Sequence, residues 1–349
     1  ERWRPVLACE PGPLAEQAMG LAVEVVPAPL SRLRKSISFP ADWMRGARSL
    51  AAHAREAGAA VIVANTVRAA VYASLAAQLA GIPFIWYMRD FWLSEAKPRN
   101  LTLDRFGKAL LGFAALGVIA NSHAVAAGLP KGSNVRVVHN GIDVSIFDPA
   151  LDGSAFRREY NIPASGPVVG MAGRLRPWKG QDRFLQAAAL VRRSVPDAWF
   201  VLVGGTPLGP QDGYPEELRR QAEELGIAEK VIFTGQVEDV SSALAAMDVF
   251  VHPGDPEPFG LVNLEAMAMG LPIVAFAHGA LPEIVLDRQT GILVPPGDLQ
   301  ALAEAIELLS KDRDLRVKLG RQGRQRVVSE FRIEKTARAV EAVLEEILR

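Results

Sequence analysis

The chain has 349 residues, of which 49% are hydrophobic and 22% charged, enough to fill two cores of about 150 to 180 residues each. Its 39 Lys and Arg residues balance 39 Asp and Glu residues, so nothing in the net charge indicates a nucleic-acid partner. The single cysteine, Cys9, excludes an internal disulfide and a cysteine-based zinc site and fits a reducing compartment.

In the first part of the chain, short apolar runs alternate with helical patterns. The expected strands are residues 4–8, 23–26, 60–64, 83–87, 117–120 and 135–138. The expected helices are residues 47–57, 69–79 and 103–116 and a short helix from 123. This alternation is typical of a doubly wound parallel sheet. Turn residues at Asn140–Asp143 and Asp148–Pro149 then interrupt the alternation and predict a linker between two domains.

Two stretches of this first part raise the question of a membrane. The uncharged window 69–88 is long enough to span a bilayer, but polar residues, Gly81 and Pro83 interrupt it, which favours a helix followed by a buried strand. Residues 1–150 carry 16 Lys and Arg against 11 Asp and Glu. Part of this surplus lies at Arg32, Arg34, Lys35, Arg45 and Arg48, beside the apolar residues Trp43, Met44, Ala47 and Leu50. Such a helix can contact an anionic membrane, although a domain helix with a solvated face is the favoured interpretation.

No charged signal region opens the chain, so we expect it not to be exported and to be cytoplasmic, with a peripheral membrane contact as the alternative.

A second series of strands and helices begins at residue 167. The expected strands are residues 168–172, 199–203, 231–234, 249–251, 271–276 and 291–294. Between and after them we expect helices at residues 184–191, 215–225, 239–247, 259–270 and 333–348 and one from 298.

Two loops of this second series carry candidate binding residues at strand ends. Arg174 and Lys179 follow the first strand, at the edge where open α/β sheets bind ligands, and two cations there can neutralise a diphosphate. Gly235 and Gln236 follow the third strand, where the glycine lets a flat base lie against the backbone. Solvated loop residues and an ordinary turn glycine are the alternative interpretations.

The stretch 252–276 predicts a strand, a bent loop, a helix and a second strand. Unpaired N–H groups at the start of that helix form a phosphate site, and they belong to Phe259, Gly260 and Leu261. Around such a phosphate, Glu257 can accept hydrogen bonds from sugar hydroxyls and Glu265 from a ribose. Alternatively, Glu257 only complements the helix dipole and Glu265 is a solvated helix residue.

Taken together, residues 173–180, 233–235 and 257–274 resemble the retaining glycosyltransferases of family 4, and the resemblance covers nearly the whole chain. That family has the GT-B architecture, an α/β fold with two Rossmann-like doubly wound domains facing across a cleft. The resemblance implies an acceptor-side domain at residues 1–147 and a nucleotide-sugar-binding domain at residues 148–330. A C-terminal helix, residues 331–349, would pack back toward the first domain.

The resemblance also implies a role for each candidate residue. Arg174 and Lys179 would hold the donor diphosphate, and Glu257 would orient the donor sugar, so these three form the catalytic set. Glu265 would accept the ribose hydroxyls. The other donor-binding residues are Gly173, Gly235, Gln236, Phe259, Gly260 and Leu261. Arg, Lys and helix amides can stabilise the departing nucleotide diphosphate without a metal, and no cofactor is expected.

Two departures from the family pattern concern the first domain. Members carry a His at the end of one strand, where this chain has Tyr87, followed by Arg89 and Asp90. We expect Arg89 either to touch an anionic acceptor or, as the favoured interpretation, to contact Asp90. Members also begin with a strand and a glycine-rich loop, and residues 1–13 resemble their second strand, so we expect the first strand and loop to be absent from this chain.

Asn121 and Ser122 match acceptor-side positions of the family, with turn and cap chemistry as an equal alternative.

These observations predict an enzyme that moves a sugar from a nucleotide-diphosphate-sugar to a hydroxyl of a glycan or lipid-linked acceptor, with retention, in the synthesis of cell-envelope glycans. The sequence does not fix the donor base, although a UDP-sugar is favoured over a GDP-sugar. A sugar-nucleotide-binding protein without turnover is the first alternative, and a sugar-nucleotide epimerase on a similar fold is the second.

Overall fold

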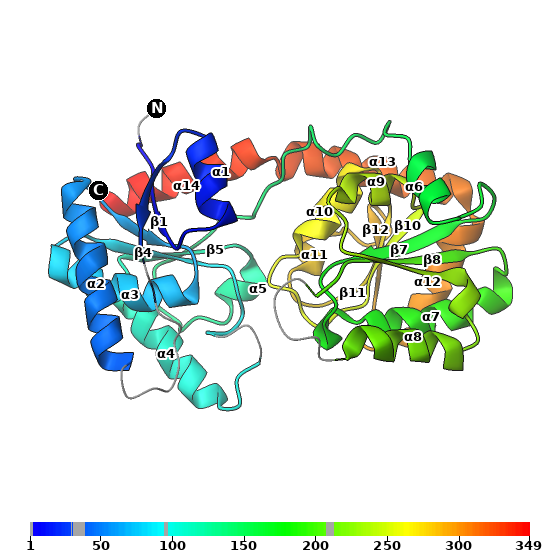
Figure 1. The fold of residues 1–349 in the computed structure, drawn as a ribbon, viewed down its shortest axis with the longest axis horizontal. Helices are drawn as coiled ribbons and strands as arrows, with labels where there is room; N and C mark the ends of the chain where they lie inside the picture. Colours follow the sequence, from blue (N-terminus) through cyan, green and yellow to red (C-terminus); the bar gives the residue numbers. More distant parts are fainter. Residues whose placement is uncertain (1–2, 29, 31–38, 94–96, 207–212) are drawn as a thin grey trace. The chain divides into compact units, whose positions relative to one another are not determined.

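The computed structural model describes residues 3–28, 30, 39–93, 97–206 and 213–349. The chain divides into two compact units, one of residues 1–138 with 340–349 and one of residues 139–339 (Figure 1). Each unit contains a parallel sheet with helical connections, as the alternating pattern of the sequence predicts.

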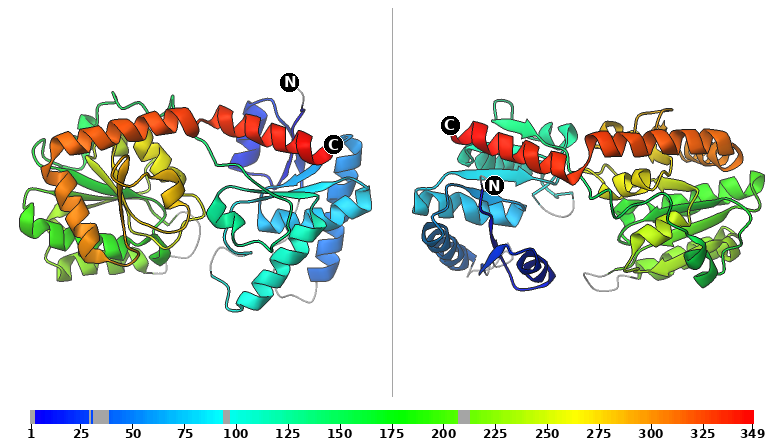
Figure 2. Two further views of the ribbon diagram at one scale, coloured as in Figure 1. Left: turned by 180° about the vertical axis from the view of Figure 1, so that it is seen from behind. Right: turned by 90° about the horizontal axis from the view of Figure 1, so that it is seen from above.

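The main sheet of the first unit has four parallel strands in chain order: β3 (Ile62–Ala64), β4 (Phe84–Met88), β5 (Gly117–Ala120) and β6 (Val135–Val137). Its helices are α2 (Phe39–Glu56), α3 (Val67–Ala80), α4 (Leu101–Ala114) and α5 (His123–Ala126). The window 69–88 is therefore the helix and buried strand that were predicted. Figure 2 shows α3 on one face of this sheet and the last turns of α14 (Ile333–Leu348) on the other. None of the helices in the described ranges has the length and hydropathy needed to cross a bilayer.

Strands β1 (Val6–Cys9) and β2 (Glu24–Pro27), joined by α1 (Pro13–Gly20), form a separate two-stranded parallel sheet. This differs from the single sheet that the strand and helix order favours. A cavity of about 430 Å³ is lined by residues of both β1 and β3, and no backbone ladder among the described residues joins the two sheets.

The basic helix of the sequence analysis is α2, and its apolar face is covered. Ala47 is fully buried, and α2 packs along α3. Trp43 donates its indole N–H to the carbonyl of Val71 at 2.9 Å. These contacts support the domain-helix interpretation. Arg45 and Arg48 lie on α2, whereas Arg32, Arg34 and Lys35 lie outside the described residues.

The second unit is built on six parallel strands in the order β12, β11, β10, β7, β8, β9. The strands are β7 (Val168–Ala172), β8 (Trp199–Val203), β9 (Val231–Gly235), β10 (Val249–His252), β11 (Ile273–Phe276) and β12 (Gly291–Val294). The helices are α6 (Ser154–Glu159), α7 (Gln181–Ser194), α8 (Tyr214–Glu224), α9 (Val240–Ala245), α10 (Leu261–Ala268), α11 (Leu281–Ile284), α12 (Leu299–Lys311) and α13 (Arg313–Glu330). Because the chain winds outward from β7 and then reverses at β10, this is the Rossmann strand order.

The boundary between the units falls at Val138 and not at residue 147. Residues 139–147 belong to the second unit because Ile142 exchanges backbone hydrogen bonds of 2.9 Å with Phe331 and Ile333. Residues 340–349 belong to the first unit, where Glu346 forms an ion pair with Arg136 of β6.

Candidate functional site

The candidate site lies at the switch point of the second sheet. Strands β7 and β10 are neighbours there, although the chain runs through β8 and β9 between them. The loops that leave their carboxyl ends are residues 173–180 and residues 253–260. The crevice between these loops is where doubly wound sheets bind ligands. Both loops were singled out from the sequence.

The two loops pack against each other through their backbones. Gly180 has φ +79° and ends a short 3₁₀ turn, and a Cβ at this position would lie 2.3 Å from the carbonyl oxygen of Pro253. The amide of Asp255 donates to the carbonyl of Trp178 at 2.7 Å. Only glycine combines this left-handed conformation with such an approach. The contact therefore fixes Lys179 beside the β10 loop.

Lys179 and Glu257 form an ion pair across the two loops. Their side chains are 16% and 6% exposed, so the pair is largely shielded from water. A neighbouring loop supports Glu257 from behind, because the amide of Ala280 donates to its carbonyl at 2.9 Å. Gly279 also approaches Glu257 so closely that a Cβ there would lie 2.6 Å from the same carbonyl oxygen. The carboxylate is thus held in one position before any ligand binds.

Arg174 is the other residue of loop 173–180 that was predicted to bind a diphosphate. It is exposed, and no acidic side chain among the described residues pairs with it. Its carbonyl accepts a hydrogen bond of 2.9 Å from the side-chain amide of the buried Gln181, which anchors the backbone at this point. An anchored backbone with a solvated guanidinium suits the capture of an anion.

Helix α10 begins with an open N-terminus. Its N-cap, Gly260, has φ +88° and offers no side-chain oxygen to the first amides. The ring of Phe259 is buried and packs on Phe331 with ring centroids 6.3 Å apart, so only its backbone is available to a ligand. Leu261 is 41% exposed. The N–H groups predicted to bind phosphate therefore lie beside the Lys179–Glu257 pair, where the helix dipole adds positive potential.

Glu265 lies in the second turn of α10 and is half-buried. Burial raises the pKa of its carboxyl above the ordinary value. A carboxylate that has lost part of its hydration is stabilised by a ligand that donates hydrogen bonds to it, as a ribose hydroxyl does.

Three glycines align the ends of β7, β8 and β9. Gly204 has φ +134°, and a Cβ on it would lie 2.0 Å from the carbonyl oxygen of Gly173. Its amide donates to the carbonyl of Gly235 at 2.9 Å. Gly235 and Gln236 are both exposed at this edge. The predicted base-binding pair is therefore on the same edge of the sheet as the predicted diphosphate-binding loop.

His252 and Asn263 lie behind Glu257 and were not predicted as site residues. His252 ends β10, and burial lowers the pKa of its imidazole to about 4, so the ring is neutral at pH 7. Its Nδ1 lies 3.2 Å from the side-chain amide nitrogen of Asn263, and its Nε2 lies 3.6 Å from a carboxylate oxygen of Glu257. The sequence showed His252 only as a polar residue at a strand end. Its burial depends on the fold and therefore could not be predicted.

The acceptor-side candidates lie in the first unit, at the ends of β4 and β5. Tyr87 is 6% exposed, its hydroxyl is buried without a partner among the described residues, and burial raises its pKa. The guanidinium of Arg89 lies 4.3 Å from the centre of the Tyr87 ring. Asn121 donates to the carbonyl of Arg89 at 3.2 Å, and Ser122 caps α5 through the amide of Val125. Asn121 and Ser122 thus have structural roles, and Asp90 is exposed.

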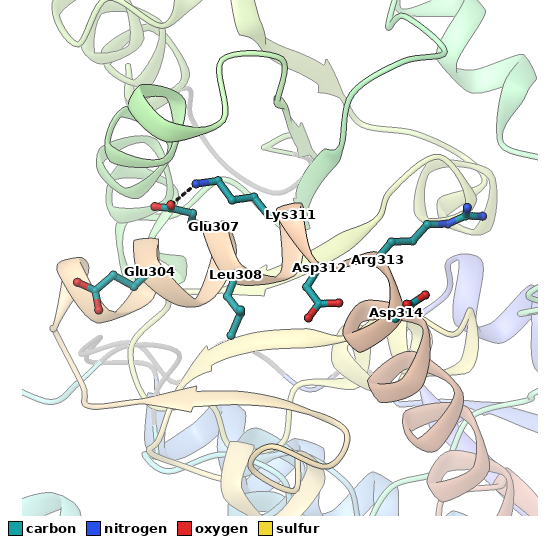
Figure 3. Close-up of a pocket in the computed structure, with 7 residues that line it drawn as sticks. All are labelled: Glu304, Glu307, Leu308, Lys311, Asp312, Arg313 and Asp314. Atoms are coloured by element: carbon teal, nitrogen blue, oxygen red, sulfur yellow. Dashed lines mark hydrogen bonds and ion pairs between the residues drawn. The ribbon is translucent and has the colours of Figure 1, made fainter.

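A separate cavity of about 670 Å³ opens at the junction of α12 and α13 (Figure 3). It is lined by Glu304, Glu307, Leu308, Lys311, Asp312, Arg313 and Asp314. Lys311 is paired with Glu307, and Asp312 caps α13 by accepting from the amide of Leu315. None of the predicted site residues lines this cavity, and its carboxylates oppose the binding of a phosphate.

Family comparisons cover both units. A family model described as glycosyl transferases group 1 matches residues 152–326, and one described as Glycosyltransferase Family 4 matches residues 4–146. The lipopolysaccharide core biosynthesis mannosyltransferase LpsB of Rhizobium meliloti is 34% identical over 234 residues, which are 66% of each chain. A GDP-mannose-dependent phosphatidylinositol monomannoside mannosyltransferase of Mycolicibacterium smegmatis is 39% identical over 53% of this chain and 49% of its own length. The chain thus spans about half to two thirds of the length of these curated relatives.

Solved structures give the same picture of the fold. HepE of Anabaena, in complex with UDP and glucose, is 27% identical with a TM-score of 0.82, covering 96% of this chain and 89% of HepE. The glycosyltransferase WaaG, at 17% identity, resembles this chain in fold with a TM-score of 0.72 over 97% of this chain and 99% of its own. These likenesses confirm the predicted GT-B fold of two Rossmann-like domains. Because the group 1 model matches half of the chain and aligns with the whole switch-point site, this chain belongs to the glycosyl transferases group 1 family.

Proposed function

We propose that this chain transfers a hexosyl group from a nucleotide-diphosphate-sugar to an acceptor hydroxyl, with retention of the anomeric configuration and without a metal ion. One observation carries the proposal. The Lys179–Glu257 ion pair lies beside the uncapped N-terminus of α10, at the switch point of a Rossmann sheet. A diphosphate needs cations and amides, a sugar needs a fixed carboxylate, and this point offers both.

The chemistry follows from the charge that develops when the glycosidic bond breaks. As the bond between the anomeric carbon and the diphosphate oxygen lengthens, negative charge accumulates on the diphosphate. Arg174, Lys179 and the first amides of α10 stabilise that charge. Glu257 holds the sugar hydroxyls, and the departing phosphate oxygen accepts the proton of the acceptor hydroxyl as the new bond forms on the same face. Arg174, Lys179 and Glu257 therefore form the catalytic set of the proposal.

A UDP-sugar is the donor that we propose first, because HepE carries UDP in its complex with glucose. GDP-mannose is the competing donor, since the mycobacterial relative is named as GDP-mannose-dependent. The base would rest at Gly235 and Gln236, and the ribose at Glu265. A glycan or lipid-linked acceptor of the cell envelope is the proposed partner, supported by the lipopolysaccharide core synthesis named for LpsB. We propose a cytoplasmic location for the reaction.

A two-stage experiment tests this proposal. Thermal unfolding with UDP, GDP and ADP first selects the base. The matching UDP-sugars or GDP-mannose are then incubated with lipopolysaccharide core, phosphatidylinositol monomannoside or inositol 3-phosphate as acceptors, with and without EDTA, and released nucleotide is quantified by chromatography. We expect acceptor-dependent release that EDTA does not reduce, and NMR of the product gives its anomeric configuration. Arg174→Ala should abolish release, whereas Arg193→Ala, an exposed arginine in the last turn of α7, should not.

A sugar-nucleotide-binding protein without turnover is the alternative, motivated by Tyr87 in place of the family histidine. Nucleotide binding without acceptor-dependent release in any combination would support it and contradict the enzyme. An epimerase would instead exchange a proton at a carbon of the donor sugar, and deuterium incorporation from heavy water would reveal that.

A further inference from the structure

Helix α4 of the first unit buries two charged residues and exposes apolar ones, which reverses the usual orientation of an amphipathic helix. Asp104 and Lys108 face inward, where they form an ion pair of 2.8 Å with side chains only 2% and 4% exposed. The amide of Leu93 donates to the Asp104 carboxylate at 2.9 Å, and the ammonium of Lys108 lies over the Trp92 ring. Helices of globular proteins normally bury the apolar face and leave charged pairs in water.

The opposite face of α4 is a continuous apolar stripe. Leu103, Phe106, Leu110 and Phe113 follow one another at three- and four-residue spacing and are 62% to 71% exposed. At 100° of rotation per residue, these positions fall within about 80° of arc on the helix. Among residues 40–93, 97–206 and 213–349, the phenylalanines with exposed side chains are Phe106 and Phe113. We therefore expect something to cover this stripe.

The exposed charges of the described residues 97–116, which include the stripe, all have the same sign. Lys97, Arg99 and Arg105 are exposed, and Asp104, the only acid between residues 97 and 116, is buried in its ion pair. On the helix, Arg105 lies about 80° of rotation beyond the edge of the stripe, on its flank. An apolar stripe with a cationic rim is complementary to an anionic lipid surface, in which acyl chains underlie negative headgroups.

A second copy of the chain fits this surface less well. At the observed exposures, four side chains of roughly 150 to 200 Å² each present on the order of 450 Å², against about 800 Å² per partner in a stable interface. Two copies meeting here would also bring like charges together, because the rim is cationic.

We propose that α4 docks the first unit on an anionic bilayer surface, with Leu103, Phe106, Leu110 and Phe113 inserted at the acyl boundary and Lys97, Arg99 and Arg105 among the headgroups. This inference does not rest on the proposed transferase activity. The sequence suggested α2 as the helix that could contact a membrane. Because α3 covers the apolar face of α2, we assign the contact to α4 instead.

The test is vesicle flotation with the full chain. We expect binding to vesicles of phosphatidylcholine mixed with phosphatidylglycerol, and little binding to phosphatidylcholine alone. Phe106→Ser with Phe113→Ser should weaken binding at least about tenfold. Leu14→Ser with Leu21→Ser is the matched control, since both residues are exposed leucines of the same unit, and it should leave binding unchanged. Arg99→Gln with Arg105→Gln should weaken binding to the anionic vesicles and reduce its salt dependence.

A second measurement reports on insertion. The variant Phe113→Trp should shift its fluorescence to shorter wavelength on anionic vesicles by more than the wild type, which already has six tryptophans, whereas a contact through another surface would leave the difference between the two spectra unchanged. Circular dichroism and thermal unfolding verify that each variant is folded. Absence of vesicle binding, or equal binding by the double phenylalanine variant, would overturn the proposal. So would a wild-type dimer that becomes monomeric in that variant, because a second copy would then cover the stripe.

Discussion

Replacing Lys179 with Met is the sharpest single perturbation of the candidate site. Met keeps most of the side-chain length but removes the ammonium, which leaves the Glu257 carboxylate, 6% exposed, without its partner. Removal of one member of a buried ion pair costs about 3 to 5 kcal/mol, and the partial exposure of Lys179 places the expected loss near the lower bound. For a unit of this size, about 3 kcal/mol corresponds to a fall in Tm of about 6 to 12 °C.

The double variant Lys179→Met with Glu257→Gln separates stability from binding. It removes both charges, so its free energy of unfolding should return to within about 1 kcal/mol of the wild-type value. The affinity for UDP or GDP should remain about 10- to 100-fold weaker, because the charge-assisted contact to the diphosphate is still missing. Urea unfolding measures the first quantity, and titration calorimetry with each nucleotide measures the second.

Two results would refute this reasoning. An unchanged unfolding free energy in Lys179→Met would mean that the ion pair is not shielded from water. Full nucleotide affinity in the double variant would mean that Lys179 does not contact the diphosphate. The control for surface charge is Lys230→Met, because Lys230 is a lysine of the same unit whose ammonium lies over the Trp199 ring. Its replacement should leave nucleotide affinity unchanged.

Three further predictions concern the backbone and the buried titratable groups of the same unit. Gly180→Ala should lower the free energy of unfolding by about 1 to 3 kcal/mol more than Gly297→Ala. Both glycines have a left-handed backbone, but only a side chain at position 180 would clash with a carbonyl, that of Pro253. Parallel urea titrations measure the difference, and equal losses in the two variants would contradict the backbone contact. The raised pKa of Glu265 means that its folded form holds the proton more tightly than its unfolded form, so its contribution to stability falls as pH rises above about 4.5. Glu265→Gln should therefore be more stable than wild type at pH 7, with a gain that disappears toward pH 4.5, and should bind nucleotide more weakly; a loss of stability at pH 7 would be inconsistent with a burial cost. His252 has a pKa lowered from 6.5 to about 4, so the unfolded chain takes up its proton first and stability falls by about 3 kcal/mol as pH drops from 6.5 to 4. His252→Gln should remove that part of the pH dependence, and an unchanged profile in urea unfolding would show that His252 is not buried in its neutral form.

The sequence by itself determined the two α/β units and the candidate loops of the second. Periodicity and turn chemistry are local properties, and they located every strand of the second sheet and the glycine-rich ends of β7, β9 and β10. Since parallel strands place their carboxyl ends on one edge, strand order was enough to bring Arg174, Lys179, Gly235 and Glu257 to the same edge.

Only the tertiary structure decided which side chains meet and which are buried. The pairing of Lys179 with Glu257 joins positions 78 residues apart, and it depends on the backbone contact at Gly180. The burial of His252 and the boundary at Val138 likewise arise from packing between segments distant in the chain. Helix α4 is the clearest case, because periodicity predicted its extent but not its orientation. A buried ion pair with partners on a neighbouring segment turned its apolar stripe outward, and no local rule contains that information.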